Sequence, residues 1–280
     1  MRKLDPPITD ARTFYLQCAQ DTRSADRRAK LVASVDAVEA AADAYLSASV
    51  DATWFALPRS IQVVPASDEE LGGLYNRTVA RAGRAGRHLY DRIIASSPVC
   101  PMCGQGKVST LDHYLPKSRY AQFAILAANL VPCCRDCNVE RGVLLPVDAQ
   151  GQTFHPYFDN VENDRWLYAQ VVLTDGASIE YFVSTPGHWP ATLAGRAASH
   201  FKVFRLGELF GTFAATELAS IKYRLQKTSM AAGSDGVRQD LRLQADSSRS
   251  VHLNSWKTAM YEALSGSDDF CDGGFEAIGE

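Results

Sequence analysis

Two pairs of cysteines at zinc-ligand spacing constrain the fold of this chain more than any other feature. Cys100-x-x-Cys103 and Cys134-x-x-Cys137 are separated by residues 104–133. Each C-x-x-C turn can direct two thiolates at one ion, and four thiolates complete the tetrahedral shell that zinc prefers. With no coordination position left for water, we expect a structural zinc. Its binding would contribute free energy to folding a segment too short to bury its own core.

The remaining composition indicates a globular protein of a reducing compartment. Three further cysteines are scattered through the 280 residues, and 46% of the chain is apolar, which suffices for a sizeable core. No window approaches the roughly 18 consecutive apolar residues of a membrane span. The start, MRKLDPPITD, has no apolar stretch of the kind found in secretory signals. We therefore expect a cytoplasmic protein with no membrane partner.

The net charge restricts how the chain could contact nucleic acid. It is −3 at neutral pH, so the chain lacks the global basic excess of many nucleic-acid binders. Contacts with phosphates must then come from local basic patches or from a partner protein.

The pattern of apolar and turn residues predicts an α+β fold. Helical patterning covers residues 10–53 and 67–95, a short strand is expected over 106–113, and a short helix over 133–141. Alternation around Asp175-Gly176 predicts a β-hairpin over 165–184.

The C-terminal part is expected to return to helix. Helical patterns cover 206–226 and 250–265, and the Gly- and Asp-rich tail from Gly266 is expected to be loosely held. We divide the chain into a helical N-terminal region (1–95), a cysteine-bound centre (96–160), and a hairpin with helices (161–280).

Polar residues between the cysteines suggest a second, hydrolytic metal site. Hydrolysis of a phosphodiester with a metal requires a hard divalent ion, a base for the attacking water, and a group that orients that base. Asp112 offers a hard oxygen for Mg²⁺ or Mn²⁺, and His113 can take the proton of water. Asn129 could fix the imidazole by a hydrogen bond, and Asn138 could complete the metal site.

This segment resembles the HNH endonuclease family in its order of Asp-His, Asn-Leu and Cys-x-x-Cys-Asn. The resemblance implies a ββα-metal core, in which strand, loop, strand and helix surround one catalytic ion. It also implies that His113 is the general base, Asn129 the central Asn, and Asp112 and Asn138 the metal ligands. The last position departs from the name-giving His, and Arg141 stands where the family usually has Lys.

A wider pattern suggests a subgroup of that family. The stretches STLDHYLPKSRY, NLVPCCRDCN and FHPYFD resemble the HNH subunit of Septu-type anti-phage defence systems. This resemblance implies a bacterial defence nuclease that works with an ATPase encoded nearby. The helical regions would then serve as docking surfaces for that partner.

Several cationic residues are candidates for contact with nucleic acid. Lys117, Arg119 and Arg141 surround the proposed site and could clamp phosphates, or they could be ordinary solvated charges. His155 could lie beside the scissile phosphate, or it could be a packed residue before a rigid proline. A third group shares one face of an expected helix and could form a track for nucleic acid or merely a solvated face: Arg77, Arg81 and Arg84.

Two other classes of function stay open at this point. Asp112-His113 could lie in a surface turn of a zinc-stabilised binding protein without catalytic activity. Alternatively, the chain could be a restriction or mobile-element HNH nuclease that acts without an ATPase. Whether the substrate is DNA, which we favour, or RNA is not encoded in these motifs.

Overall fold

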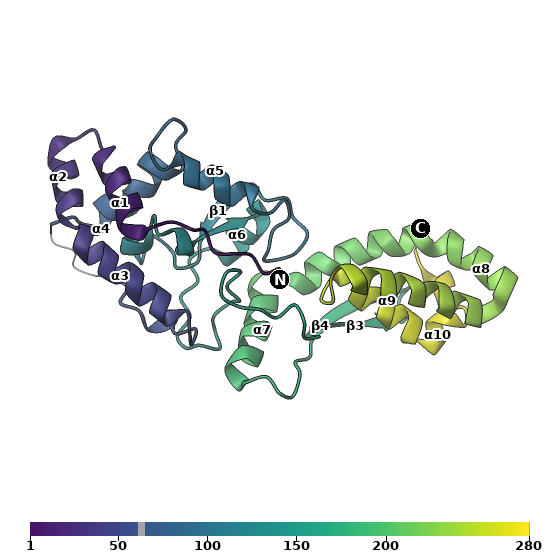
Figure 1. The fold of residues 1–280 in the computed structure, drawn as a ribbon. Helices are drawn as coiled ribbons and strands as arrows, with labels where there is room; N and C mark the ends of the chain where they lie inside the picture. Colours follow the sequence, from purple (N-terminus) through teal and green to yellow (C-terminus); the bar gives the residue numbers. More distant parts are fainter. Residues whose placement is uncertain (61–64, 280) are drawn as a thin grey trace. The chain divides into compact units, whose positions relative to one another are not determined.

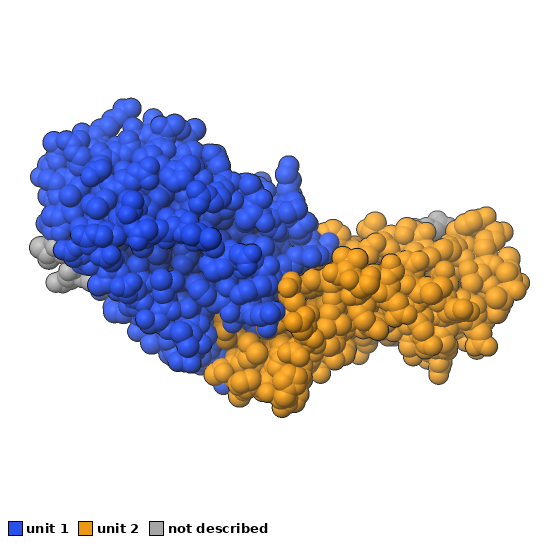
Figure 2. Space-filling view, viewed as in Figure 1, with its two compact units in different colours: residues 1–160 blue, residues 161–280 orange. Residues whose placement is uncertain are grey.

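The computed structural model describes residues 1–60 and 65–279 (Figure 1). The chain divides into two compact units, Met1–Asn160 and Val161–Glu280 (Figure 2). Both units combine helices with a small sheet, and the two sheets found in the described residues are two-stranded and antiparallel. The mixed fold class predicted from the sequence is thus confirmed. Within the same residues, none of the helices is long and apolar enough to cross a membrane.

Unit 1 begins with three helices. They are α1 (Ala11–Gln20), α2 (Ala25–Ala33) and α3 (Val35–Ala48), and they fall within the predicted helical region. Asp10 and Ser24 cap the first two by accepting hydrogen bonds from backbone N–H groups of the first turn.

The second helical region of unit 1 is interrupted. Helix α4 (Asp68–Leu74) begins after Ser67, which forms a capping box, and it runs into a π-helical turn, η2 (Tyr75–Val79). The chain then leaves the helix through Gly83, whose φ of 71° lies in the left-handed region, before α5 (Arg87–Ala95) starts.

The centre of unit 1 is a strand pair followed by a helix. Strands β1 (Thr110–His113) and β2 (Leu130–Cys133) are antiparallel, and α6 (Arg135–Arg141) contacts β1. The first strand is shorter than the predicted 106–113. The helix ends at Arg141, where the predicted range of 133–141 also ends, and Gly142 caps it with a φ of 50°. The register pairs Thr110 with Cys133, Leu111 with Pro132, Asp112 with Val131, and His113 with Leu130.

One hydrophobic core joins the N-terminal helices to the strand pair. The buried cluster takes residues from the first three helices, from α4 and α5, and from the segment that contains the strands. Its members include Phe14, Leu31, Leu74, Leu89, Leu111, Ala124 and Leu130. The helical region 1–95 and the cysteine-containing region 96–160 are therefore parts of a single unit.

Unit 2 opens with the predicted β-hairpin. Strands β3 (Leu167–Val172) and β4 (Ser178–Val183) pair in antiparallel fashion around Gly176, which has a φ of 105°. The register runs from Leu167 opposite Val183 to Val172 opposite Ser178. Helix α7 (Ala191–Val203) follows.

Helix α8 (Leu206–Val251) is longer than the predicted 206–226 and reverses at Gly233. Arg224 and Asp240, on either side of the reversal, form an ion pair of 3.2 Å. Sixteen residues of straight helix would separate them by about 24 Å, so the two halves pack side by side.

The C-terminal tail is well packed, and the prediction that it is loosely held is wrong. After α9 (Trp256–Gly266) come α10 (Asp268–Cys271) and the 3₁₀ segment η5 (Gly274–Ala277). Three apolar side chains of the tail are buried: Phe270, Phe275 and Ile278. Their burial removes apolar surface from water, and the free energy gained outweighs the conformational entropy lost when the surrounding glycines are ordered.

Candidate functional site

The four cysteines of the two pairs lie together in unit 1. The sulfur atoms of Cys100, Cys103, Cys134 and Cys137 are all within 4.8 Å of one another, and all four residues are buried. The Sγ atoms of Cys103 and Cys134 are 4.0 Å apart. Zinc–sulfur bonds of about 2.3 Å in a tetrahedron give sulfur–sulfur edges of about 3.8 Å. The quartet can therefore hold one metal ion, as its spacing predicted.

Backbone N–H groups surround two of these sulfurs. The N–H groups of Gln105 and Gly106 donate to Cys103 Sγ at 3.5 and 3.3 Å, and the N–H of Cys137 donates to Cys134 Sγ at 3.4 Å. Such donors favour the thiolate form that a metal requires. The hydrogen bond from the Cys100 thiol, with help from this backbone, lowers the pKa of Cys103.

Gly106 is required for the sulfurs to come together. A Cβ atom at this position would lie 2.6 Å from Cys134 Cβ and 2.7 Å from its Sγ. The neighbouring Gly104 has a φ of 70°, which closes the turn after Cys103. The glycines thus allow the first cysteine pair to approach the second.

The quartet is attached directly to the strand pair. Cys133 ends β2 and accepts a hydrogen bond of 3.0 Å from Ser109 N–H, while Cys134 caps α6. Cys133 is itself buried but is not one of the four metal-ligand candidates. A metal in the quartet would therefore fix the start of α6 relative to β1.

Asp112 is buried on β1 with both carboxylate oxygens engaged. Oδ1 accepts the N–H of His113 at 2.7 Å, and Oδ2 lies 3.2 Å from Arg141 Nη1. Burial raises the pKa of Asp112, and the guanidinium of Arg141 opposes that shift. The carboxylate is therefore neutralised by a cation from α6.

His113 has one defined hydrogen bond on its ring. Nε2 lies 2.9 Å from the carbonyl oxygen of Ala124. A carbonyl only accepts, so Nε2 carries the proton and Nδ1 holds the lone pair. Among the described residues, Nδ1 has no hydrogen-bond partner.

The surroundings of His113 keep its ring neutral. Burial, together with the charge of Lys117, lowers the pKa of His113 to about 3. The ring of Tyr75, from η2, packs edge-on with its centroid 4.5 Å from that of the imidazole. His113 is thus an uncharged imidazole of fixed tautomer at neutral pH.

Asn129 holds the loop between the strands and does not bond to the imidazole. Its Oδ1 accepts from Leu115 N–H at 2.6 Å, and its Nδ2 donates to the carbonyls of Leu115 and Phe123 at 3.0 and 3.1 Å. The predicted direct contact with His113 is wrong, because backbone groups of the loop use the whole amide. Asn129 acts on the imidazole indirectly, by fixing the loop that presents the carbonyl of Ala124.

Asn138 lies half-buried in the first part of α6, and its N–H donates to Cys134 O at 3.1 Å. Asp112 and Asn138 provide a carboxylate and an amide, the hard oxygens that suit Mg²⁺. In this structure both oxygens of Asp112 are engaged, by the N–H of His113 and by Arg141, so an ion would bind there only by displacing the Arg141 guanidinium. For the described residues, clusters of three or more His, Cys, Asp or Glu side chains able to hold a metal are limited to the cysteine quartet.

Of the three predicted phosphate clamps around the site, two are available to solvent. Arg119 is exposed and Lys117 is half-buried, with its Nζ 2.9 Å from Asn76 Oδ1 and 4.4 Å from the Tyr75 ring centroid. Both line an open cavity of about 380 Å³. Arg141 is buried with Asp112, so its predicted contact with phosphate is wrong.

His155 is a core residue. Its exposed fraction is 0%, its Nε2 lies 3.1 Å from the Tyr45 hydroxyl, and its Nδ1 accepts the N–H of Tyr157 at 3.2 Å. The ring stacks on Trp54 and lies 4.1 Å, centroid to centroid, from Tyr114. The prediction that His155 contacts phosphate is wrong, because aromatic rings surround it.

The predicted arginine track does not form on one helix face. The chain leaves the helix after Val79, so Arg77, Arg81 and Arg84 do not share a helical register. Arg77 donates to the carbonyl of Glu70, and the guanidinium of Arg84 pairs with Asp21. Of the three, Arg81 is the exposed one.

Two groups that define the surroundings of His113 were not found from the sequence. Tyr75 comes from a distant helical segment, and the acceptor for Nε2 is a backbone carbonyl, which no residue type encodes. Asn129 was the available signal for an ordered loop, since a buried amide must satisfy all its hydrogen-bonding groups.

Comparison with known proteins identifies the family of the chain. It is 30% identical to protein ea31 of Escherichia phage lambda over 233 residues, which are 77% of this chain and 78% of that protein. The chain belongs to the ea31 family. Because unit 1 ends at Asn160, a match of this length extends into both units. No family model matches the chain, and no solved structure does.

Proposed function

We propose that this ea31-family protein is a metal-dependent endonuclease of the HNH type, which hydrolyses phosphodiester bonds in nucleic acid, most readily DNA. The observation that carries the proposal is the state of His113. With its Nε2–H held by Ala124 O, the neutral imidazole keeps an unprotonated Nδ1 that has no hydrogen-bond partner among the described residues. A general base needs such a fixed lone pair.

In the proposed reaction, Nδ1 of His113 accepts a proton from the attacking water. The Ala124 carbonyl holds the ring at its other nitrogen, and Asn129 holds the loop that contains this carbonyl. Several residues of the loop between β1 and β2 therefore orient the imidazole together.

Asp112 and Asn138 are the oxygen donors that would hold Mg²⁺ or Mn²⁺. When bound, the ion would stabilise charge on the phosphate and on the leaving oxygen. The ion would take the place of the Arg141 guanidinium, which neutralises Asp112 in this structure. The cysteine quartet, with zinc, has a structural role: it ties the helix of Asn138 to the strand of Asp112.

We also propose that a partner protein contributes to binding nucleic acid. The net charge is −3, and the buried or paired state of Arg77, Arg84 and Arg141 removes three of the predicted contacts with phosphates. The resemblance to the Septu nuclease subunit favours an ATPase encoded nearby and a role in anti-phage defence. The phage origin of ea31 instead favours a nuclease of a mobile element, so this reading is the second candidate.

The test is cleavage of plasmid DNA by the purified protein with Mg²⁺ or Mn²⁺. Nicking or linearisation should disappear with EDTA and in the variant His113→Ala. The variant His188→Ala is the matched control, because His188 is an exposed histidine of unit 2. If folded, zinc-loaded protein cleaves neither DNA nor RNA, with or without the ATPase, the nuclease proposal fails and a binding protein is favoured.

A further inference from the structure

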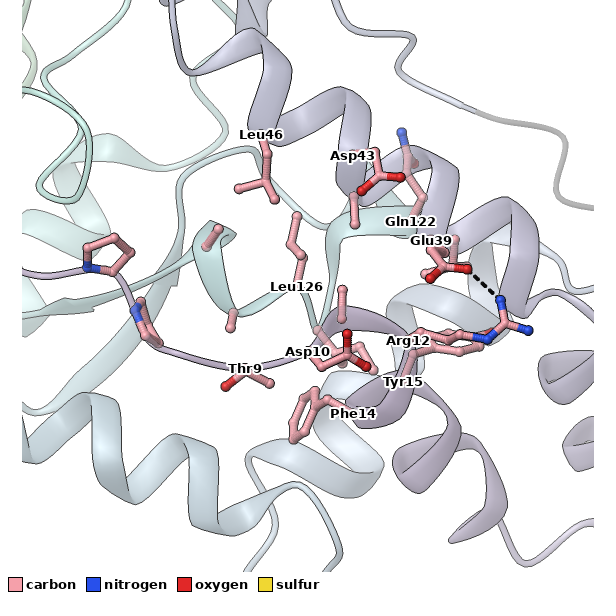
Figure 3. A pocket seen from close by; sticks show the side chains of 18 of the residues that line it. Thr9, Asp10, Arg12, Phe14, Tyr15, Glu39, Asp43, Leu46, Gln122 and Leu126 are labelled. Atoms are coloured by element: carbon pink, nitrogen blue, oxygen red, sulfur yellow. Dashed lines mark hydrogen bonds and ion pairs between the residues drawn. The ribbon is translucent and has the colours of Figure 1, made fainter.

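A second cavity of unit 1 lies against the far end of the loop between β1 and β2. Its volume is about 340 Å³, within the range of ligand pockets. Figure 3 shows Asp43 and Leu46 of α3 on one side, Leu126 in the middle, and Asp10 and Phe14 on the other side. Much of the apolar lining comes from α1, α3 and the loop: Phe14, Val38, Ala42, Leu46, Ile125 and Leu126.

Carboxylates dominate the polar part of this cavity. Asp10, Glu39 and Asp43 line it, and Arg12 is the one lining residue with a positive charge. The guanidinium of Arg12 is already paired with Glu39 and with Asp36, the latter at 2.7 Å. Among the described residues, Asp43 has no ion-pair or hydrogen-bond partner, and it is exposed. The cavity therefore has an excess of negative charge.

Apolar surface lies next to the unpaired carboxylate. Leu46 is 45% exposed, and it follows Asp43 by three positions, so both side chains lie on one face of α3. Leu126, from the loop, is only half-buried. An occupant that complements this surface needs an apolar side chain for the cavity and a positive charge for Asp43.

We propose that this cavity is a docking site for a segment of a partner protein that combines an apolar anchor, such as Leu or Phe, with a neighbouring Lys or Arg. Charge complementarity to the unpaired carboxylate of Asp43 selects the basic residue. The cavity takes the anchor, which would bury Leu46 and Leu126. An apolar anchor in a pocket with a charged rim is the usual arrangement of the strongest contacts in protein interfaces.

The loop between β1 and β2 connects the docking site to the candidate catalytic histidine. Ile125 and Leu126 directly follow Ala124, the acceptor for His113 Nε2. The loop between the strands thus forms the wall of the cavity and also holds the imidazole. The coupling of the docking site to His113 rests on the proposed function, whereas docking itself does not.

Docking can be tested with a display library of random dodecapeptides and purified full-length protein. Selected peptides should be enriched in Leu, Ile or Phe beside Lys or Arg. A synthetic copy of the best peptide should bind at least about tenfold more weakly to Asp43→Lys and to Leu46→Asp. Asp51→Lys is the matched control, because Asp51 is an exposed acid just beyond the end of α3 that does not line the cavity; binding to this variant should change less than about twofold.

Three results would overturn the proposal: no enrichment, binding that survives Asp43→Lys and Leu46→Asp, or equal loss in the Asp51→Lys control. Circular dichroism and zinc content would show that each variant is folded. Sedimentation measures the oligomeric state and so tests for the competing occupant. A wild-type dimer that dissociates in Leu46→Asp would mean that a second copy of the chain, and not a partner segment, covers this face.

A separate measurement distinguishes docking from its coupling to the nuclease site. Binding is measured in His113→Ala protein, so it does not depend on catalysis. Hydrogen exchange of the amides of Ala124, Leu126 and Asn129, which donate within the loop, should slow when the peptide binds. Unchanged exchange together with binding would reject the coupling and keep the docking site.

Discussion

The guanidinium of Arg141 lies 3.2 Å from the carboxylate of Asp112, and both side chains are buried. Arg141 also donates to the carbonyl of Tyr114 and lies over its ring, 4.5 Å from the centroid. The last turn of α6 is thereby joined to β1 and to the first residue of the loop. This ion pair connects the two elements that contain the proposed metal ligands.

Removing the cation should leave an uncompensated buried charge. We expect Arg141→Met to lower the free energy of unfolding of zinc-loaded protein by about 3–5 kcal/mol, measured by urea denaturation. The double variant Asp112→Asn with Arg141→Met should lose less than the single variant, because no buried charge is left. Equal losses in the two proteins would show that the ion pair contributes nothing beyond packing.

Metal removal should affect unit 1 through the cysteine quartet. We expect one zinc per chain by elemental analysis and loss of that zinc in Cys134→Ser, with loss of cooperative unfolding of unit 1. Structural zinc contributes roughly 10–16 kcal/mol in small zinc modules. Cys271→Ser is the matched control, since Cys271 is buried but lies outside the quartet. Full zinc content in Cys134→Ser would exclude the quartet as the site.

Asn129→Ala should act through the loop. The variant leaves the N–H of Leu115 and the carbonyl of Phe123 without their partner, which costs about 1–3 kcal/mol for each buried group left unsatisfied. We expect a lower melting temperature together with a fall in nuclease activity. If activity falls without any change in stability or in the exchange of loop amides, Asn129 has a role other than holding the loop.

The buried imidazole should make stability depend on pH. The pKa of His113 is about 3 in the folded protein and about 6.5 in an unfolded chain. Between these values the unfolded chain binds the extra proton, so the contribution of His113 is complete above pH 6.5 and is lost as the pH falls toward 3. The slope should approach about 1.4 kcal/mol per pH unit.

Comparison with His113→Gln isolates this contribution, because Asp112, whose raised pKa has the opposite sign, is present in both proteins. The difference in unfolding free energy between wild type and variant should shrink as the pH is lowered from 6.5. A constant difference would mean that His113 is not buried in its neutral form.

The sequence was sufficient wherever a feature depends on a few neighbouring residues. The cysteine spacings determined the quartet, Asp175-Gly176 the turn of the hairpin, and Gly142 the end of α6. These features follow from local backbone geometry, which a side chain or its absence restricts directly. The order of Asp112, His113, Asn129 and Asn138 predicted one catalytic site, which stays a prediction.

Only the tertiary structure decided which distant groups meet. It turned Arg141 inward to Asp112, placed His155 among aromatic rings, and brought Tyr75 and the carbonyl of Ala124 to His113. The sequence does not distinguish a solvated arginine from a buried one. An arginine is buried only where the interaction with a partner offsets the free-energy cost of removing its charge from water. That partner is set by how a whole unit packs its core, and no spacing within one segment contains this information.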